Sequence, residues 1–268
     1  MPMPYSKTVS ILQITDLHIL PDPGEKMLGI DTEYYFKAVL EQAFAAGNTF
    51  DLVLVSGDLA QDPCAASYTR ILKTLERYPV NSVCLPGNHD DYPLMLSLFN
   101  SQKISCNKQT LFDDWQLICL NSQIPGRPGG NIGNEELLFL QKCLTEQPNY
   151  FALIAVHHHV LPTQSQWMDT MLIENQQEVL NILRDFPQVK AVTTGHIHQV
   201  MDRDYQSIRV LGSPATCFQF KPLCSDFTLD LEMPGYRIIN LLPDGSIETS
   251  VYRLPGLLQE LSLDSFGY

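Results

Sequence analysis

The stretch Val9-Ser-Ile-Leu-Gln-Ile-Thr-Asp-Leu-His18 combines an apolar run with two polar side chains at its end. The apolar pattern over residues 9–15 predicts a β-strand, and Asp16 and His18 follow it directly. Side chains two residues apart in an extended chain point the same way, so Asp16 and His18 can reach one ion. The stretch therefore predicts a strand with a metal-binding pair at its carboxyl end.

Four further motifs repeat this arrangement of a strand pattern followed by polar residues. They are Gly57-Asp58 after residues 51–56, Gly87-Asn-His-Asp90 after 81–85, His157-His-His159 after 151–156, and Gly195-His-Ile-His198 after 189–194. In open α/β sheets ligands bind beyond the carboxyl ends of the strands, so five polar clusters at five strand ends can converge on one crevice. The glycines at positions 57, 87 and 195 let the backbone turn tightly beside it.

The histidines of the chain are concentrated in these motifs. All seven lie there, at positions 18, 89, 157, 158, 159, 196 and 198. Structural histidines would be scattered over core and surface, so this concentration indicates a shared role. Imidazole, carboxylate and amide ligands together suit first-row transition metals better than magnesium. None of the motifs contains a cysteine, which argues against a structural zinc site.

Helix patterns alternate with strand patterns along most of the chain. We expect helices at residues 32–46, 65–78, 91–100, 135–145 and 176–186, with Asp31 capping the first. A hairpin is expected to turn at Asp113 and Asp114, and residues 125–133 form a loop rich in turn residues. After Val200 the pattern becomes strand-like. These elements predict an α/β fold of two packed sheets with helices outside. We expect one domain over residues 1–268, with 254–268 as a C-terminal tail.

Composition narrows the class of protein. The 268 residues carry a formal net charge of −13, which disfavours a nucleic-acid polymer as partner because polyanion binding rests on basic patches. No apolar run approaches the roughly 20 residues of a membrane span, and the N-terminus lacks the hydrophobic stretch of a signal peptide. The seven cysteines show no metal-type or redox-type spacing. We therefore expect a cytoplasmic protein with reduced thiols and no membrane partner.

In this order, the motifs resemble the pattern D-x-H, G-D, G-N-H-D, H and G-H-x-H of the calcineurin-like metallophosphoesterases. Longer segments resemble the bacterial class III cyclic AMP phosphodiesterases, among them residues 11–18, Ser56-Gly-Asp-Leu-Ala-Gln-Asp62, Leu85-Pro-Gly-Asn-His-Asp90 and Gly212-Ser-Pro-Ala-Thr-Cys-Phe-Gln-Phe-Lys-Pro222. The resemblance covers about residues 9–253. It implies a two-sheet β-sandwich flanked by helices, an α/β/β/α fold, which agrees with the element pattern.

The resemblance also implies a centre of two metal ions bridged by Asp58. The implied ligands are Asp58 at both ions, Asp16, His18 and His198 at the first, and Asn88, His157 and His196 at the second. His157 aligns best within the triplet because it comes directly off the strand. His158 is the alternative, since His159 stands where the family often has proline. The family leads us to expect iron with manganese, with zinc, cobalt or magnesium as alternatives.

The function that the resemblance implies is hydrolysis of a phosphodiester, with 3′,5′-cyclic AMP as substrate and 5′-AMP as product. A hydroxide that bridges the metals would attack phosphorus in line. His89 would act as the acid or charge stabiliser at the leaving oxygen, and Asn88 and His198 would also contact substrate. The charge of the metals would make the pocket electropositive despite the net −13.

Several alternatives share the same motifs. A broad-specificity phosphodiesterase or a 2′,3′-cyclic nucleotide hydrolase would use the same metal core. A non-catalytic scaffold with this fold is disfavoured, because every ligand position and His89 are filled. The oligomeric state, monomer or dimer, stays open.

Substrate contacts outside the metal core have a weaker basis. Phe220 can stack on a base and Lys221 can meet phosphate, beside Gln219, in a segment that resembles the cyclic nucleotide group. An ordinary strand with an exposed lysine explains the same residues equally well. Arg127 is a comparable candidate, because loops like 125–133 often border sites.

Overall fold

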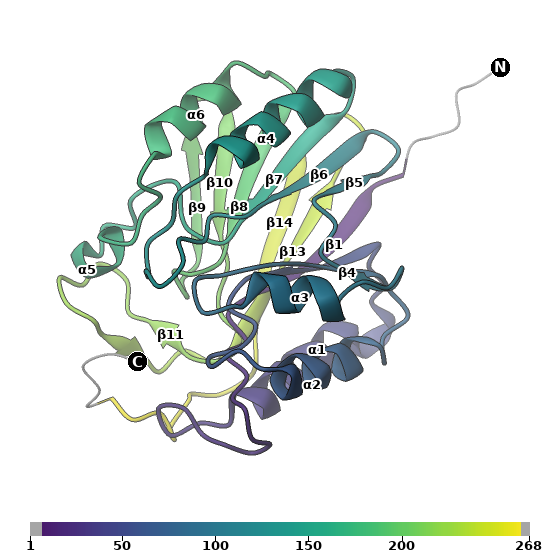
Figure 1. Cartoon of the computed structure of the whole chain (residues 1–268). Coiled ribbons are helices and arrows are strands. Elements are labelled where there is room, and N and C mark those ends of the chain that lie inside the picture. Colours follow the sequence, from purple (N-terminus) through teal and green to yellow (C-terminus); the bar gives the residue numbers. More distant parts are fainter. Residues whose placement is uncertain (1–6, 264–268) are drawn as a thin grey trace.

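Two six-stranded sheets form the centre of the computed structural model, which describes residues 7–263 (Figure 1). In spatial order, the first contains β14 (Ile247–Arg253), β13 (Gly235–Leu241), β1 (Val9–Ile14), β2 (Leu52–Ser56), β3 (Ser82–Leu85) and β4 (Ile104–Ser105). The second contains β5 (Gln109–Leu111), β6 (Trp115–Leu120), β7 (Phe151–Val156), β8 (Val189–Thr194), β10 (Ile208–Gly212) and β9 (Met201–Tyr205). A small separate sheet pairs β11 (Gln219–Phe220) with β12 (Leu229–Asp230).

Helices cover the outer face of each sheet (Figure 1). The first sheet carries α1 (Thr32–Phe44), α2 (Ala65–Leu75) and α3 (Tyr92–Leu98), and the second carries α4 (Asn134–Glu146) and α6 (Gln176–Arg184). Apolar residues fill both helix–sheet layers, and a third cluster that includes Leu54 and Leu153 fills the space between the sheets. The expected α/β/β/α fold is confirmed.

Most expected elements are present, and β7 and β8 have the expected bounds. Asp31 caps α1, and a 3₁₀ turn, η1 (Ala45–Gly47), follows that helix. Helix α2 ends at Leu75 and not at residue 78, because the amides of Arg77 and Tyr78 bond back three residues in tighter turns. The short helix α5 (Gln166–Asp169) was not expected.

As far as the structure describes it, the C-terminal segment packs beside two loops, and the amides of Leu258 and Ser262 donate to the carbonyls of Leu231 and Leu28, both at 2.9 Å. Leu258 and Leu261 are buried in the same apolar cluster as α4 and α6, and residues 264–268 of the expected tail lie outside the described part. All seven cysteines lie within residues 7–263 and are free thiols. Within those residues, no helix is both long enough and apolar enough to cross a membrane.

A buried polar network joins the two sheets near the strand ends. Gln13 of β1 donates through Nε2 to Ser56 Oγ (2.9 Å) and to the carbonyl of Thr194 (3.2 Å). Its Oε1 accepts from Thr193 Oγ1 and from Ser213 Oγ, both at 2.6 Å. Because the amide's donors and acceptor are all used, it carries little desolvation penalty. The network therefore ties β1 and β2 to β8 and β10.

Candidate metal centre

The five polar motifs meet where β1, β2, β3, β7 and β8 end. Parallel pairing places the first three strand ends side by side in one sheet and the last two side by side in the other. Backbone hydrogen bonds join the turns that follow, from the Asp16 amide to the Gly57 carbonyl (3.0 Å) and from the Gly195 amide to the His157 carbonyl (3.1 Å). Each sheet therefore supplies one half of the site.

The backbone of these turns is strained. Asp16, His18, Asp58, His196 and His198 have φ angles from 45° to 64°, in the left-handed region that non-glycine residues rarely adopt. Such conformations cost roughly 1–3 kcal/mol each and persist only where the surroundings hold them. Their concentration at one place marks it as a functional site.

Two buried carboxylates face imidazoles from both sheets. Asp58 Oδ2 lies 3.2 Å from His157 Nε2 and 3.8 Å from His18 Nε2, and Asp16 Oδ1 lies 3.2 Å from His198 Nε2. Three groups hold ligand atoms within 4.8 Å of one another: His18 with His198 and Cys217, His18 with Asp58 and His89, and Asp58 with His157 and His196. These clusters fit a dinuclear metal site.

Three imidazoles are oriented by the ring nitrogen that faces away from the carboxylates. The contacts are His18 Nδ1 to Gln61 Oε1 (2.7 Å), His157 Nδ1 to the Ser56 carbonyl (2.8 Å) and His198 Nδ1 to the Phe218 carbonyl (2.8 Å). Since each oxygen can only accept, Nδ1 carries a proton, and Nε2 is the ring nitrogen that faces the centre and is left to bind a metal. This is the tautomer that a metal-binding imidazole needs.

Two further motif residues carry buried polar atoms that no protein group satisfies. Asn88 Oδ1 and both ring nitrogens of His196 have no hydrogen-bond partner within residues 7–263. An unmade bond of this kind costs roughly 1–3 kcal/mol. The backbone amide of His196 donates to Asp16 Oδ2 at 3.0 Å, which fixes the residue beside the carboxylate. The Asn88 oxygen and the unprotonated ring nitrogen of His196 are therefore suited to bind metal ions.

Neighbouring charges shift the pKa values of the ionisable groups in the centre. Burial opposes ionisation of Asp58, but the neighbouring imidazoles, His157 foremost, hold its pKa well below its usual range. Burial lowers the pKa of His18 to about 3, which leaves its ring neutral. Burial also opposes the charge on His157, yet Asp58 and Asp16 raise its pKa to about 9. The two carboxylates therefore attract positive charge to the space between them, as they would a cation.

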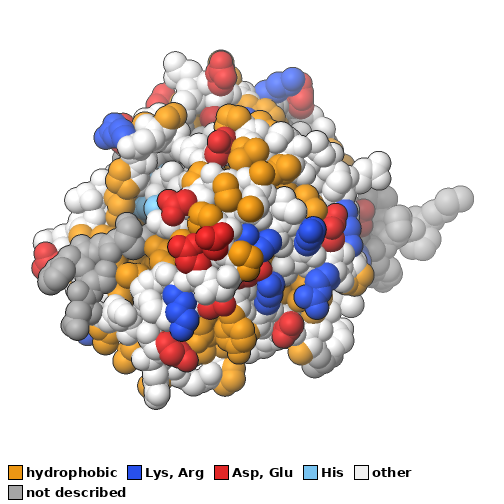
Figure 2. All heavy atoms as spheres, turned by 60° about the horizontal axis from the view of Figure 1, so that its bottom comes forward, with side chains coloured by type: hydrophobic (Ala, Val, Ile, Leu, Met, Phe, Trp, Pro, Cys, Tyr) orange, Lys and Arg blue, Asp and Glu red, His pale blue; other side chains and the backbone are white. Residues whose placement is uncertain are grey.

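His89 lies at the outer side of this group. His89 is half-buried, whereas the other six histidines are buried. On the face of the molecule shown in Figure 2, little histidine surface is visible among the acidic and hydrophobic side chains. The His89 amide donates to Asp58 Oδ1 at 2.9 Å, and its ring meets His18 edge to face at 5.1 Å. The imidazole is therefore placed where an incoming ligand can meet it.

Asp90 holds two of the turns together, a role that sequence reasoning missed. Its buried carboxylate accepts from the amides of Gly87 (2.9 Å) and Leu59 (3.1 Å) and from the Tyr68 hydroxyl (2.9 Å). Burial, reinforced by Asp58, raises the pKa of Asp90 to about 6. Asp90 belongs to the G-N-H-D motif, but Tyr68 lies in α2 and carries no local signal of this contact.

The structure also adds a cysteine, although none lies in the motifs. Cys217 Sγ is 4.0 Å from His198 Nδ1, on the side of the ring that faces away from Asp16. Burial raises the pKa of this thiol well above its ordinary value, so it stays protonated at neutral pH. The connection between β10 and β11 brings Cys217 here, and sequence spacing gave no indication of it.

The other histidines of the triplet have different surroundings. His158 uses both ring nitrogens, Nδ1 with Ser122 Oγ (2.7 Å) and Nε2 with the Pro128 carbonyl (3.1 Å). His159 Nε2 lies 3.6 Å from Asp169 Oδ1. His157 alone of the three lies within 4 Å of Asp16 and Asp58 among the described residues.

Two of the three candidate substrate contacts in the segment after β10 are buried. Phe220 is only 1% exposed, and its ring stacks on His198 with the centroids 4.2 Å apart. Gln219 is buried, and its amide bonds the backbone of Ala215. Lys221 is exposed. Phe220 therefore backs a histidine of the centre and does not lie on the open surface.

Arg127 lies in the loop between β6 and α4. Its guanidinium pairs with Glu174 at 2.7 Å, and both side chains are largely exposed. Arg127 therefore has a charged partner within the protein, and no substrate is needed to explain its presence in the loop.

The comparisons with known proteins identify the family. Residues 9–200 match the family model described as calcineurin-like phosphoesterase. The chain belongs to this family. It is 38% identical to the 3′,5′-cyclic adenosine monophosphate phosphodiesterase CpdA of Escherichia coli strain K12, over all of this chain and 98% of that protein. It is 34% identical to the CpdA of Pseudomonas aeruginosa, over 97% of this chain and 96% of that one.

A solved structure shows the same fold. The crystal structure of a dimetal phosphatase from Danio rerio has a TM-score of 0.61 and 16% identity, covering 91% of this phosphoesterase and 98% of the other chain. At this identity the likeness concerns the fold alone. It agrees with the two-sheet architecture described above.

Proposed function

We propose that this phosphoesterase uses two metal ions to hydrolyse 3′,5′-cyclic AMP to 5′-AMP. The observation that carries the proposal is the meeting of buried carboxylates and imidazoles at adjoining ends of both sheets. The substrate is inferred from the identity of 38%, along the whole chain, to a protein named as a cyclic AMP phosphodiesterase.

We assign Asp58 as the ligand shared by both ions, because its Oδ2 lies near His18 on one side and His157 on the other. The remaining ligands in this assignment are Asp16, His18 and His198 at the first ion and Asn88, His157 and His196 at the second. The ring contacts that occupy both nitrogens of His158 support His157 over its neighbour. Iron with manganese is the metal pair that we propose.

The chain's own residues position the substrate and handle the proton. When bound, two ions would supply positive charge for the phosphate and lower the pKa of a bound water toward neutrality. We assign Asn88, His89 and His198 to the phosphoryl group, with Phe220 holding the His198 ring from behind. His89 gives a proton to the 3′-oxygen as its bond to phosphorus breaks, while the oxygen of a water that has lost one proton to solvent forms the new bond.

We place the enzyme in the cytoplasm. Seven free thiols, four of them buried, suit a reducing compartment.

The test compares kcat/KM for 3′,5′-cyclic AMP, 2′,3′-cyclic AMP, an aryl phosphodiester and an aryl monoester, with the protein loaded with manganese or iron. We expect a strong preference for 3′,5′-cyclic AMP that Asp58→Asn abolishes. Turnover of only the aryl diester or the 2′,3′ isomer would refute the substrate and favour a broad-specificity phosphodiesterase or a 2′,3′-cyclic nucleotide hydrolase. Metal-loaded protein that turns over none of them would point to a scaffold.

A further inference from the structure

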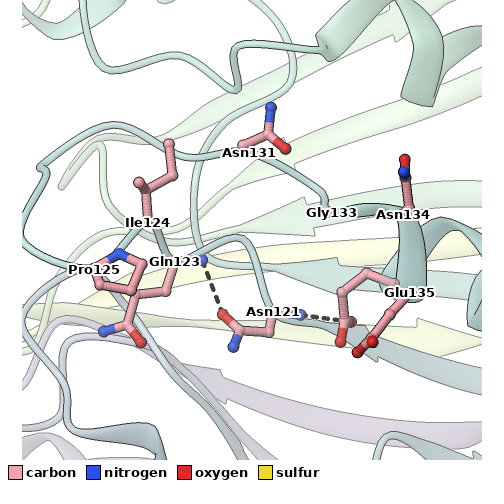
Figure 3. A pocket seen from close by; sticks show the side chains of 9 residues that line it. Asn121, Gln123, Ile124, Pro125, Asn131, Gly133, Asn134 and Glu135 are labelled. Atoms are coloured by element: carbon pink, nitrogen blue, oxygen red, sulfur yellow. Dashed lines mark hydrogen bonds between the residues drawn. The ribbon is translucent and has the colours of Figure 1, made fainter.

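A cavity of about 380 Å³ lies between the end of β6 and the start of α4. Figure 3 shows Ile124 and Pro125 on one side of it and Asn134 and Glu135 on the other, with Asn131 at its border. We call it the amide pocket, because Asn121, Gln123, Asn131 and Asn134 line it. Its volume is near the lower end of the range for small-molecule sites, roughly 300–1,000 Å³.

The amide pocket adjoins the metal centre. β6 is the parallel neighbour of β7, so the pocket begins at the same edge of the sheet as His157. Gln123 Nε2, in its wall, donates to the Gly87 carbonyl at 2.9 Å and also to the Asp90 carbonyl. The turn between these two residues carries Asn88 and His89. A wall of the pocket is therefore in direct contact with the turn that carries His89.

The lining has the wrong charge for phosphate. Among the described residues that line the pocket are two carboxylates, Glu135 and Glu136, and no lysine or arginine. Glu136 is matched by Lys108, with Nζ and Oε1 2.6 Å apart, which leaves Glu135 to set the sign of the field. An anion is repelled here, whereas a neutral group is not.

The lining has the right chemistry for a nucleobase. Side-chain amides both donate and accept, and Asn or Gln pairs with two edge atoms of adenine at once. Ile124 and Pro125 add an apolar wall for the face of the ring. An aromatic base offers a larger flat face to this wall than a sugar ring does, so the combination favours a base.

The loop that forms the pocket is held in place before any ligand arrives. Asn121 Oδ1 accepts from the Gln123 amide at 2.8 Å, which leaves its side-chain NH₂ to donate elsewhere. The backbone N–H of Asn131 donates to the Ser122 carbonyl at 2.9 Å, and the side chain of Asn175 forms two hydrogen bonds with the backbone of Ile132. Binding to such a preformed loop costs little ordering entropy.

We propose that the amide pocket is the nucleobase subsite and that Asn131 and Asn134 are its specificity-determining residues. The proposal rests on the proposed function, because it takes the phosphate at the metals and the base as parts of one cyclic nucleotide.

The experiment compares wild type with Asn131→Ala/Asn134→Ala as metal-loaded full chains. kcat/KM for 3′,5′-cyclic AMP is expected to fall roughly 5- to 100-fold, the range for one lost bidentate amide contact. kcat/KM for an aryl phosphodiester, which has no base, is expected to stay within about twofold. The matched control is Gln177→Ala/Asn181→Ala, which removes two amides that bond each other on α6. An equal fall for both substrates, or none for cyclic AMP, would overturn the subsite.

Adenosine separates this inference from the proposed function. It has the base but no phosphate, and saturation-transfer NMR reports its contact with the protein. Contact with wild type that is lost in the Asn131→Ala/Asn134→Ala variant supports the subsite, even in an enzyme that fails to hydrolyse cyclic AMP. Equal contact in both proteins, or none with wild type, rejects it.

Discussion

Replacing Gly87 by alanine tests whether the position of Asp58 controls the centre. A Cβ on Gly87 would lie 2.2 Å from Asp58 Oδ1 and 2.4 Å from the Asp58 amide nitrogen. Carbon and oxygen atoms in contact are separated by roughly 3.4 Å, so the carboxylate must move by about 1 Å. The φ angle of Gly87 is not in the left-handed region, so this displacement is the main effect of the substitution.

The expected loss follows from that displacement. A misplacement of about 1 Å in a catalytic group costs on the order of 100-fold in rate. Overpacking a buried turn adds roughly 1–3 kcal/mol of destabilisation. We expect Gly87→Ala to lower kcat/KM for an aryl phosphodiester by about 100-fold and to lower metal content together with it.

The assay measures metal by elemental analysis and kcat/KM on the same preparation. Gly129→Ala is the matched control, because the atom nearest to its Cβ would be Met171 Cα, at an ordinary 3.6 Å. Gly87→Ala protein with full metal content and wild-type kcat/KM would refute the reasoning, since Asp58 would then not need its observed position.

Three further predictions follow from the site and its surroundings. Asp58→Asn should lower metal affinity by more than the roughly 10- to 100-fold typical of replacing a residue that only hydrogen-bonds to a metal ligand. Unchanged metal content would contradict the assignment of Asp58 as the shared ligand. His89→Ala should slow an unactivated diester by roughly 10²–10⁴-fold and an aryl diester much less; equal losses would remove its role as acid. For Asp169, burial opposes ionisation, but His159 and Thr163 lower its pKa to about 2 from 3.8. Because this pKa is lower in the folded protein, ionised Asp169 stabilises the fold at pH values above about 4. This stabilisation is lost as the pH falls from about 4 toward 2. Asp169→Asn should therefore destabilise by about 1–2 kcal/mol near pH 6 and less near pH 3 in urea unfolding, and a pH-independent difference would argue against this account.

The strands and their polar ends could be predicted because their signals are local. A buried strand such as β7 is a short apolar run, and the histidine motif that follows it directly ends the run. Parallel strands put such ends at one edge, so convergence follows from the pattern alone. The family resemblance added the pairing of motifs from the two sheets, and the match over residues 9–200 confirms the family.

The supporting contacts could not be predicted, because they depend on packing between distant segments. Tyr68 reaches Asp90 from an amphipathic helix, and its position in the sequence is typical of any core aromatic residue. Gln61 meets His18 only through the pairing of β1 with β2. Phe220 was expected to face a base, whereas the fold of the segment after β10 stacks it on His198.

Gln13 shows why a site split between two sheets needs an internal polar link. Apolar packing between sheets, as by Leu54 and Leu153, is non-directional and tolerates small sliding movements. A slide of about 1 Å would separate Asp58 from His157, which now lie 3.2 Å apart on different sheets. Directional hydrogen bonds from one amide to both sheets oppose that slide. The need to hold the two halves of the centre at fixed positions thus accounts for buried Gln13 in β1. Because all its polar atoms are hydrogen-bonded, its burial costs little stability.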